Sequence, residues 1–110
     1  SEILRVVHLA SKSTKLDMAK MGAMDPLPVE VYTIYYLKQM VLNDNNLMSI
    51  SPLIGNPRMR GLMQLNLANN LLTKLPEEVS LLVDLHFLVL HNNHLVSIHP
   101  GIAGLTNLHR

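Results

Sequence analysis

The strongest constraint on the fold of this chain is an internal repeat. The segment LMQLNLANNLL, which begins at Leu62, superimposes on LHFLVLHNNHL, which begins at Leu85, and the offset, 85 minus 62, is 23 residues. Both segments follow the pattern L-x-x-L-x-L-x-x-N-x-L. Self-similarity at a fixed period of roughly 20 to 50 residues is typical of solenoids, in which each unit packs only against its neighbours.

The repeat extends toward the N-terminus with small changes of length. LKQMVLNDNNL begins at Leu37, so this unit has 62 minus 37, or 25, residues, and we place its two extra residues around the GNPR segment that begins at Gly55. The unit before it matches the repeat pattern less well. We therefore predict a repeat domain over residues 13–110, with about four units starting near residues 13, 37, 62 and 85 and a further unit truncated at 108–110.

Residues 1–12 do not fit the repeat, and their apolar residues recur at helical spacing. We expect them to form a capping helix that covers the exposed end of the first unit.

The residue pattern within each unit predicts an α/β architecture. Its short strand has period two, with inward leucines such as Leu65 and Leu67, and the proline-led segment that follows has apolar spacing three, which suits a short helical or 3₁₀ turn on the convex side. Stacked units then share one core below a parallel concave sheet. Asn45, Asn70 and Asn93 recur where the strands turn, and we expect their amides to bond to unpaired backbone groups. Met21 holds this position in the first unit and cannot do so.

Composition excludes several classes of function. Apolar residues make up 48% of the chain and charged residues 15%, which favours a folded domain, and the net charge of +1 with scattered cations argues against nucleic acid. The absence of cysteine favours a reducing compartment, so we expect a cytoplasmic location and leave a nuclear one open. Glu2, Arg5 and His8 interrupt the opening segment, which excludes a signal peptide there, and the longest apolar segment, 79–90, is too short to span a membrane.

Over residues 27–110 the pattern L-x-x-L-x-L-x-x-N-x-L-x-x-L-P-x-x-I/V resembles the intracellular leucine-rich repeats of the Ras-suppressor and Scribble-type scaffold family. The resemblance implies a right-handed coil and an adaptor role in signalling, with a small GTPase, a phosphatase or an adhesion component as partner. The family's motif residues are structural, so the resemblance transfers no functional residue to this chain.

Counting outward positions along the strands predicts a partner-binding surface of three columns on the concave sheet. Beyond Lys15, Asp17 and Ala19 of the first unit, the candidate residues are Gln39, Val41, Asn43, Gln64, Asn66, Ala68, Phe87, Val89 and His91. Amides beside apolar side chains suit a protein partner, and we expect Phe87 to be the anchor.

Three other sites are less well supported. His86, His91, His94 and His99 fall within one unit, but their spacing and the lack of an accompanying carboxylate argue against a metal site. Glu77 and Glu78 suit the first turn of a helical segment better than acid-base catalysis. Tyr32, Tyr35 and Tyr36 occur without adjacent cations, which favours packing or an interface over nucleotide stacking.

The sequence therefore predicts a non-enzymatic interaction module without metal or cofactor. The alternative left open is a substrate-recruiting region of a larger kinase, cyclase or ubiquitin ligase. The oligomeric state stays open as well.

Overall fold

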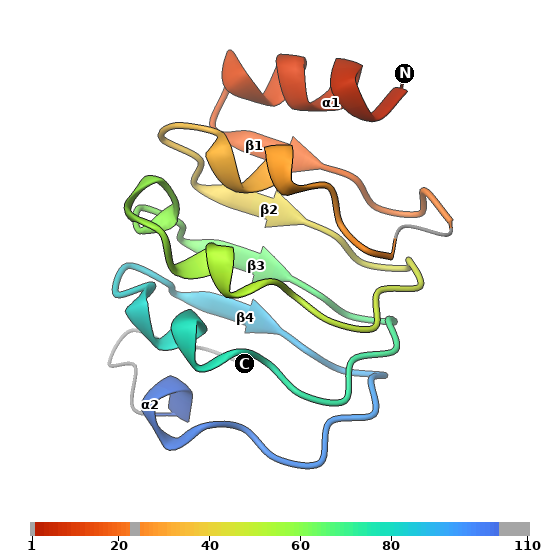
Figure 1. The fold of residues 1–110 in the computed structure, drawn as a ribbon, viewed down its shortest axis with the longest axis vertical. Coiled ribbons are helices and arrows are strands. Elements are labelled where there is room, and N and C mark those ends of the chain that lie inside the picture. Colours follow the sequence, from red (N-terminus) through yellow and green to blue (C-terminus); the bar gives the residue numbers. More distant parts are fainter. Residues whose placement is uncertain (1, 23–24, 104–110) are drawn as a thin grey trace.

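The computed structural model describes residues 2–22 and 25–103, so the truncated unit predicted at 108–110 lies outside the described residues. Four three-residue strands form one parallel sheet in the order β1-β2-β3-β4, and their bounds are Lys15–Asp17, Gln39–Val41, Gln64–Asn66 and Phe87–Val89. Since each strand pairs with the next one along the chain, the chain advances by one coil per unit (Figure 1).

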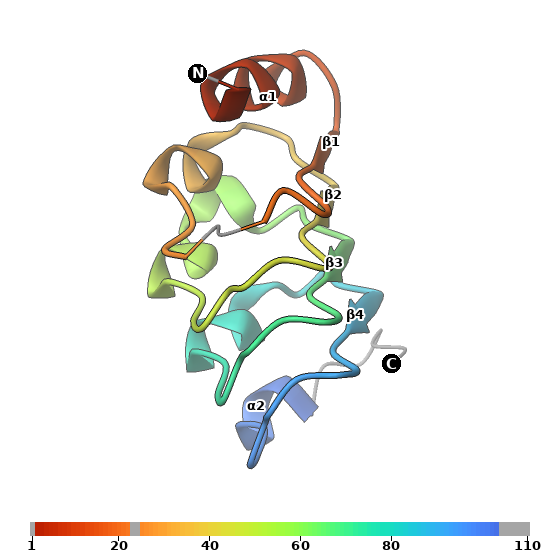
Figure 2. The same ribbon diagram turned by 90° about the vertical axis from the view of Figure 1, so that its right-hand side faces the viewer.

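The return segments lie on the side opposite the sheet, as Figure 2 shows. They contain the 3₁₀ helices η1 (Val29–Thr33), η2 (Pro52–Gly55), η3 (Pro57–Met59) and η4 (Glu77–Leu81) and a short α-helix, α2 (Pro100–Ala103). Prolines begin most of these turns because a fixed φ and a missing N–H suit a first helical position. None of the helices in the described residues is long and apolar enough to cross a membrane.

Helix α1 (Glu2–Ser11) lies beside β1 at the N-terminal end of the stack (Figure 1). Ala10 is buried in the core, and the half-buried Val6 and Val7 pack against it. The helix therefore covers apolar side chains of the first coil. The fold class predicted from the repeat, an α/β solenoid with a helical N-terminal cap, is confirmed.

The core is a set of ladders in which equivalent residues of successive units stack. The central strand residues Leu16, Met40, Leu65 and Leu88 pair in register, and all are buried. Each such side chain contributes about 2 kcal/mol by leaving water, but only when a neighbouring unit covers it. Folding free energy therefore comes from contacts between units.

The recurring asparagines connect each unit to the one before it. Asn45 Nδ2 donates to the carbonyl oxygens of Leu42 in its own unit and Met18 in the preceding one, at 3.0 and 2.9 Å. Its Oδ1 accepts the N–H of Met21 at 2.9 Å. The amide reaches backward to a turn of the preceding coil, and the first unit follows α1 instead of such a coil, so a methionine can hold the asparagine position there.

Asn70 repeats this arrangement one unit later. Its Nδ2 lies 3.1 Å from the Leu42 oxygen and 3.0 Å from the Leu67 oxygen, and its Oδ1 accepts the Leu47 N–H. Asn93 bonds in the same way to the following pair of turns. The three side chains satisfy backbone groups that the turning strands leave without ladder partners.

The residue before each of these asparagines adopts a left-handed conformation. The φ values are 60° at Asp44 and 57° at both Asn69 and Asn92, and Lys20 of the first unit has 59°. Asparagine and aspartate tolerate this region better than other non-glycine residues. The dipeptides at 44–45, 69–70 and 92–93 therefore encode both the turn and its hydrogen bonds.

Candidate functional site

The predicted binding residues of the concave face lie in columns across the sheet. The register pairs Gln39 with Gln64 and Gln64 with Phe87, and it pairs Val41 with Asn66 and Asn66 with Val89. These side chains are exposed or half-buried, whereas the leucine or methionine between them in each strand is buried. The alternation thus presents amide and apolar groups side by side.

Phe87 stands at the most apolar part of this face. Phe87 lies in β4 beside its register partner Gln64 in β3, and it is still 47% exposed. A hollow of about 260 Å³ opens there, lined by Gln64, Leu65, Asn66, Phe87 and Val89. A shallow depression with an aromatic wall and amide groups suits an apolar side chain of a protein partner.

The third column differs from expectation. Asn43 is half-buried and His91 exposed, but Ala68 is only 3% exposed and contributes almost no surface. Its methyl group is too short to project beyond the longer side chains around it. Asn66 has a structural contact as well, because its Oδ1 accepts the Ala68 N–H at 3.1 Å and stabilises the turn. Its Nδ2 group is the part of the amide that we expect to contact a partner.

A larger depression, outside the predicted concave residues, lies among the 3₁₀ segments and includes the three tyrosines for which the sequence favoured packing or an interface. We call it the convex groove: it has a volume of about 810 Å³ and is lined by Tyr32, Thr33, Tyr35, Tyr36, Lys38, Leu53, Asn56, Pro57, Arg58 and Gly61. Its walls come from two successive units, one ending in the tyrosine cluster and the other carrying η2 and η3. It exceeds the hollow beside Phe87 in volume.

The expectation that the tyrosines lack cationic neighbours is wrong. The Arg58 guanidinium carbon lies 4.3 Å from the centroid of the Tyr35 ring, and Arg58 Nη1 donates to the Thr33 carbonyl oxygen at 3.4 Å. The two residues are far apart in sequence and meet only because successive coils stack. The one signal in the sequence was the lengthened unit around Asn56, which carries Arg58 to this position.

Tyr32 forms the buried wall of the groove. Its hydroxyl oxygen accepts the Ser51 N–H at 3.2 Å. Burial raises the pKa of the Tyr32 phenol, and the hydrogen bond from the Ser51 backbone opposes this rise. The phenol therefore serves as a neutral acceptor that ties two adjacent coils together.

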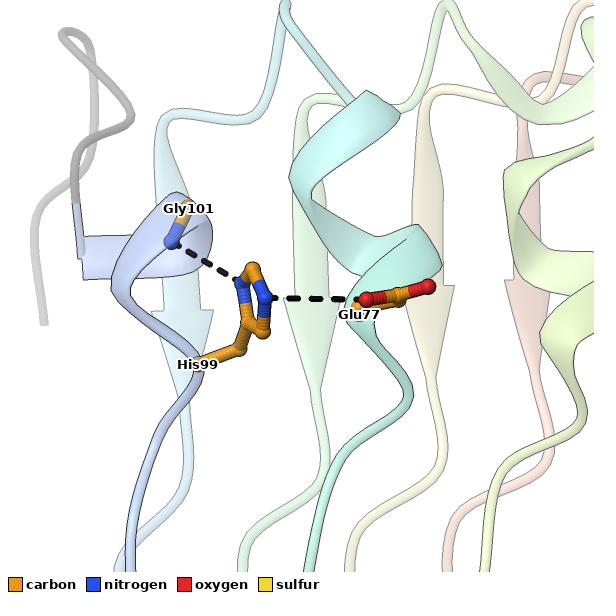
Figure 3. Close-up of polar contacts among 3 residues, drawn as sticks. All are labelled: Glu77, His99 and Gly101. Atoms are coloured by element: carbon orange, nitrogen blue, oxygen red, sulfur yellow. Dashed lines mark hydrogen bonds and ion pairs between the residues drawn. The ribbon is translucent and has the colours of Figure 1, made fainter.

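The histidines of the last described unit do not converge. Figure 3 shows His99 between two partners: its Nε2 lies 3.6 Å from a Glu77 carboxylate oxygen, and its Nδ1 accepts the Gly101 N–H at 3.0 Å. His99 thus begins α2 and connects it to η4. Within residues 2–22 and 25–103, no three histidine, aspartate or glutamate side chains come together as metal ligands.

Comparison with solved structures identifies the architecture. A leucine-rich-repeat protein from Leptospira interrogans superimposes on this chain with a TM-score of 0.78 at 24% sequence identity. The chain has the leucine-rich-repeat fold. The alignment covers 96% of this chain and 32% of the Leptospira protein, so the chain spans about a third of the length of that protein.

No protein-family model matches this leucine-rich-repeat chain, and no curated protein does. The leucine-rich-repeat assignment made from the periodic leucines is confirmed at the level of the fold. Membership of the Ras-suppressor and Scribble-type family remains a prediction.

Proposed function

We propose that this leucine-rich-repeat chain is a protein interaction module that binds a protein partner on its concave face. The observation that carries the proposal is the hollow at Phe87, where a 47% exposed aromatic ring lies in a sheet of amide and aliphatic side chains. Exposed aromatic rings beside polar groups are favoured at interface centres, since they bury large areas and lose few rotamers.

The size of the face supports a modest affinity. Strands in a sheet lie about 4.8 Å apart, so four strands extend over about 15 Å, which is narrow for a standard interface. Contact therefore depends on a few anchors, with Phe87 first and the amides of Gln64 and Asn66 fixing orientation.

The proposed role is that of a non-catalytic adaptor in intracellular signalling. By resemblance alone, the partner classes to test first are a small GTPase, a phosphatase and an adhesion component. The described carboxylates support a structural use, because Glu77 pairs with His99 and Glu78 packs beside Gly55 at the contact between η2 and η4.

Affinity capture with three forms of the chain tests the concave site. The wild type and Val83→Ala, which truncates an exposed residue outside the sheet, are expected to retain the same proteins, and Phe87→Ala is expected to lose a subset of them. For an isolated member of that subset, Phe87→Ala should weaken binding by about tenfold or more. Its free energy of unfolding should fall by only about 1 kcal/mol, because the ring is half exposed. Identical capture by all three forms would place the binding site elsewhere.

A further inference from the structure

The convex groove owes its shape to the longest unit of the repeat. In that unit η2 and η3 follow each other around Asn56, whereas the next unit has the single 3₁₀ helix η4. Asn56 Oδ1 accepts the Arg58 N–H at 2.9 Å and begins η3, while Asn56 Nδ2 donates to the Tyr32 carbonyl oxygen at 3.0 Å. One asparagine therefore fixes the inserted turn and attaches it to the preceding coil.

Two aromatic side chains of the groove lie close together, and a guanidinium covers one of them. Tyr35 and Tyr36 have ring centroids 6.0 Å apart at an interplanar angle of 41°, and Arg58 covers the Tyr35 ring. Tyr36 is 82% exposed and has a φ of 61°, which is unusual for a bulky residue. Tyrosine rings have few rotatable bonds, so they lose little entropy when a ligand packs on them.

The charged side chains that line the groove are all basic. Lys38 and Arg58 both line it, and none of the described lining residues is acidic. A guanidinium stacked on an aromatic ring keeps its N–H groups in a plane that can donate two parallel hydrogen bonds to a carboxylate. An occupant with a negative group next to an apolar stretch would complement this surface.

The position of the groove limits the backbone form of the occupant. Its lining combines 3₁₀ segments with Lys38 and Gly61, which precede β2 and β3. The backbone N–H and carbonyl groups of Lys38 already bond to neighbouring coils, so an entering strand would find no free ladder there to extend. A polyproline II segment needs no such ladder, since it presents rings and side chains without internal hydrogen bonds, and it packs well against exposed tyrosines.

We propose that the convex groove is a second binding site, which takes an extended, proline-containing peptide segment of a protein partner with an acidic residue beside the prolines. The proline rings would lie on Tyr35 and Tyr36, and the carboxylate would face Arg58 and Lys38. This site is independent of the concave face, and the two can be tested separately.

Gly61 offers a way to block the groove without disturbing the fold. It lines the groove, and a Cβ built on it meets no heavy atom within 4 Å. Gly61→Leu should therefore fill the groove, and Gly61→Ala is the matched control that adds only a methyl group. Arg58→Glu reverses the charge of the opposite wall, and thermal unfolding of each variant checks that it folds.

The test begins with selection of phage-displayed random seven-residue peptides on the wild-type chain, with counter-selection on Gly61→Leu. Enriched peptides should combine proline with aspartate or glutamate. A synthetic peptide of the winning sequence, followed by fluorescence anisotropy, should bind wild type, Gly61→Ala and Phe87→Ala equally. Its binding to Gly61→Leu and Arg58→Glu should be weaker by about tenfold or more.

Several results would overturn the proposal. These are no enrichment, enrichment of basic or proline-free peptides, or equal affinity of the synthetic peptide for Gly61→Leu. Saturable binding of ATP or a short oligothymidylate that Gly61→Leu abolishes, without peptide binding, would assign the groove to another ligand class. Loss of peptide binding in Phe87→Ala would place the peptide on the concave face instead.

Discussion

The concave face is formed by the regular part of the repeat, whereas the convex groove is formed where one unit departs from the repeat. On the concave face every unit contributes a three-residue strand in strict register, so Gln64 lies beside Phe87 and Asn66 beside Val89. In the convex groove the walls differ because one unit ends in tyrosines and the next contains two extra residues near Asn56. Regular units make a flat surface with shallow relief, and an irregular unit makes a depression.

This difference separates residues that hold the stack together from residues that shape a site. The leucine ladders recur in each unit, the asparagines Asn45, Asn70 and Asn93 recur in the three units after the first, and both sets lie at contacts between coils. The groove depends on contacts that occur once, such as Arg58 on Tyr35. Substitutions in the ladders should lower the free energy of unfolding. Substitutions of the groove residues should lower it less and should weaken binding.

The largest expected effect is at the asparagine ladder. Asn70→Leu removes four hydrogen bonds and leaves the buried Leu47 N–H without its acceptor, whereas the Leu42 and Leu67 carbonyl oxygens keep the Asn45 and Asn93 amides. The free energy of unfolding should fall by roughly 3 kcal/mol. Urea unfolding measures this change. Asn66→Leu, on the concave surface of the same unit, is the control and should cost about 1 kcal/mol or less. An equal fall in the free energy of unfolding for both variants would contradict the distinction between the buried asparagines and the surface residues.

An intermediate effect is expected where convex turns pack closely. A Cβ on Gly55 would lie 2.8 Å from the Glu78 Cβ and 3.1 Å from the Glu78 carbonyl oxygen, so Gly55→Ala must push η2 away from η4. We expect a loss of about 1 to 3 kcal/mol by thermal or urea unfolding. Gly61→Ala, which meets open space, should change stability by about 0.5 kcal/mol or less. The opposite order would mean that the turns are not packed as described.

The smallest expected effect concerns Tyr32 and depends on pH. Tyr32→Phe removes the acceptor of the Ser51 N–H and should cost about 1 kcal/mol at neutral pH. Because burial raises the pKa of this phenol in the folded chain, the wild type loses stability as pH rises above the ordinary tyrosine value of about 10. The variant lacks that loss, so the gap between the two chains should narrow above about pH 10.

Urea unfolding between pH 8 and pH 11, roughly the span around the tyrosine value, measures this gap. Tyr35→Phe, which removes an exposed phenol of the same groove, is the matched control. A gap that stays constant or widens with pH would show that Tyr32 is not buried between the coils.

The periodic leucines were enough to predict the solenoid, the sheet register and the positions of Asn45, Asn70 and Asn93. These features follow from local spacing that every unit repeats. The burial of Ala68 was not predictable, because counting gives the direction of a side chain but not how far its neighbours extend. The Arg58 contact with Tyr35 was missed because it depends on the path of an inserted turn, which no second unit repeats.

The residue types at the left-handed turn positions also carry a signal. Asp44, Asn69 and Asn92 precede the ladder asparagines, and their residue types alone favour positive φ. Lys20 adopts the same conformation without that preference, so stacking against the next unit imposes it.

Thiol cross-linking measures the alignment of concave side chains most directly, since the chain contains no cysteine. The double variant Gln39→Cys and Gln64→Cys places thiols on register partners of adjacent parallel strands, whose Cα atoms lie about 5 Å apart. A short bifunctional thiol reagent should join them within one molecule, and it should join Gln39→Cys with Phe87→Cys, two strands away, far more slowly. Rapid cross-linking of the distant pair, or none of the adjacent pair, would contradict the stacked parallel sheet and the binding face built on it.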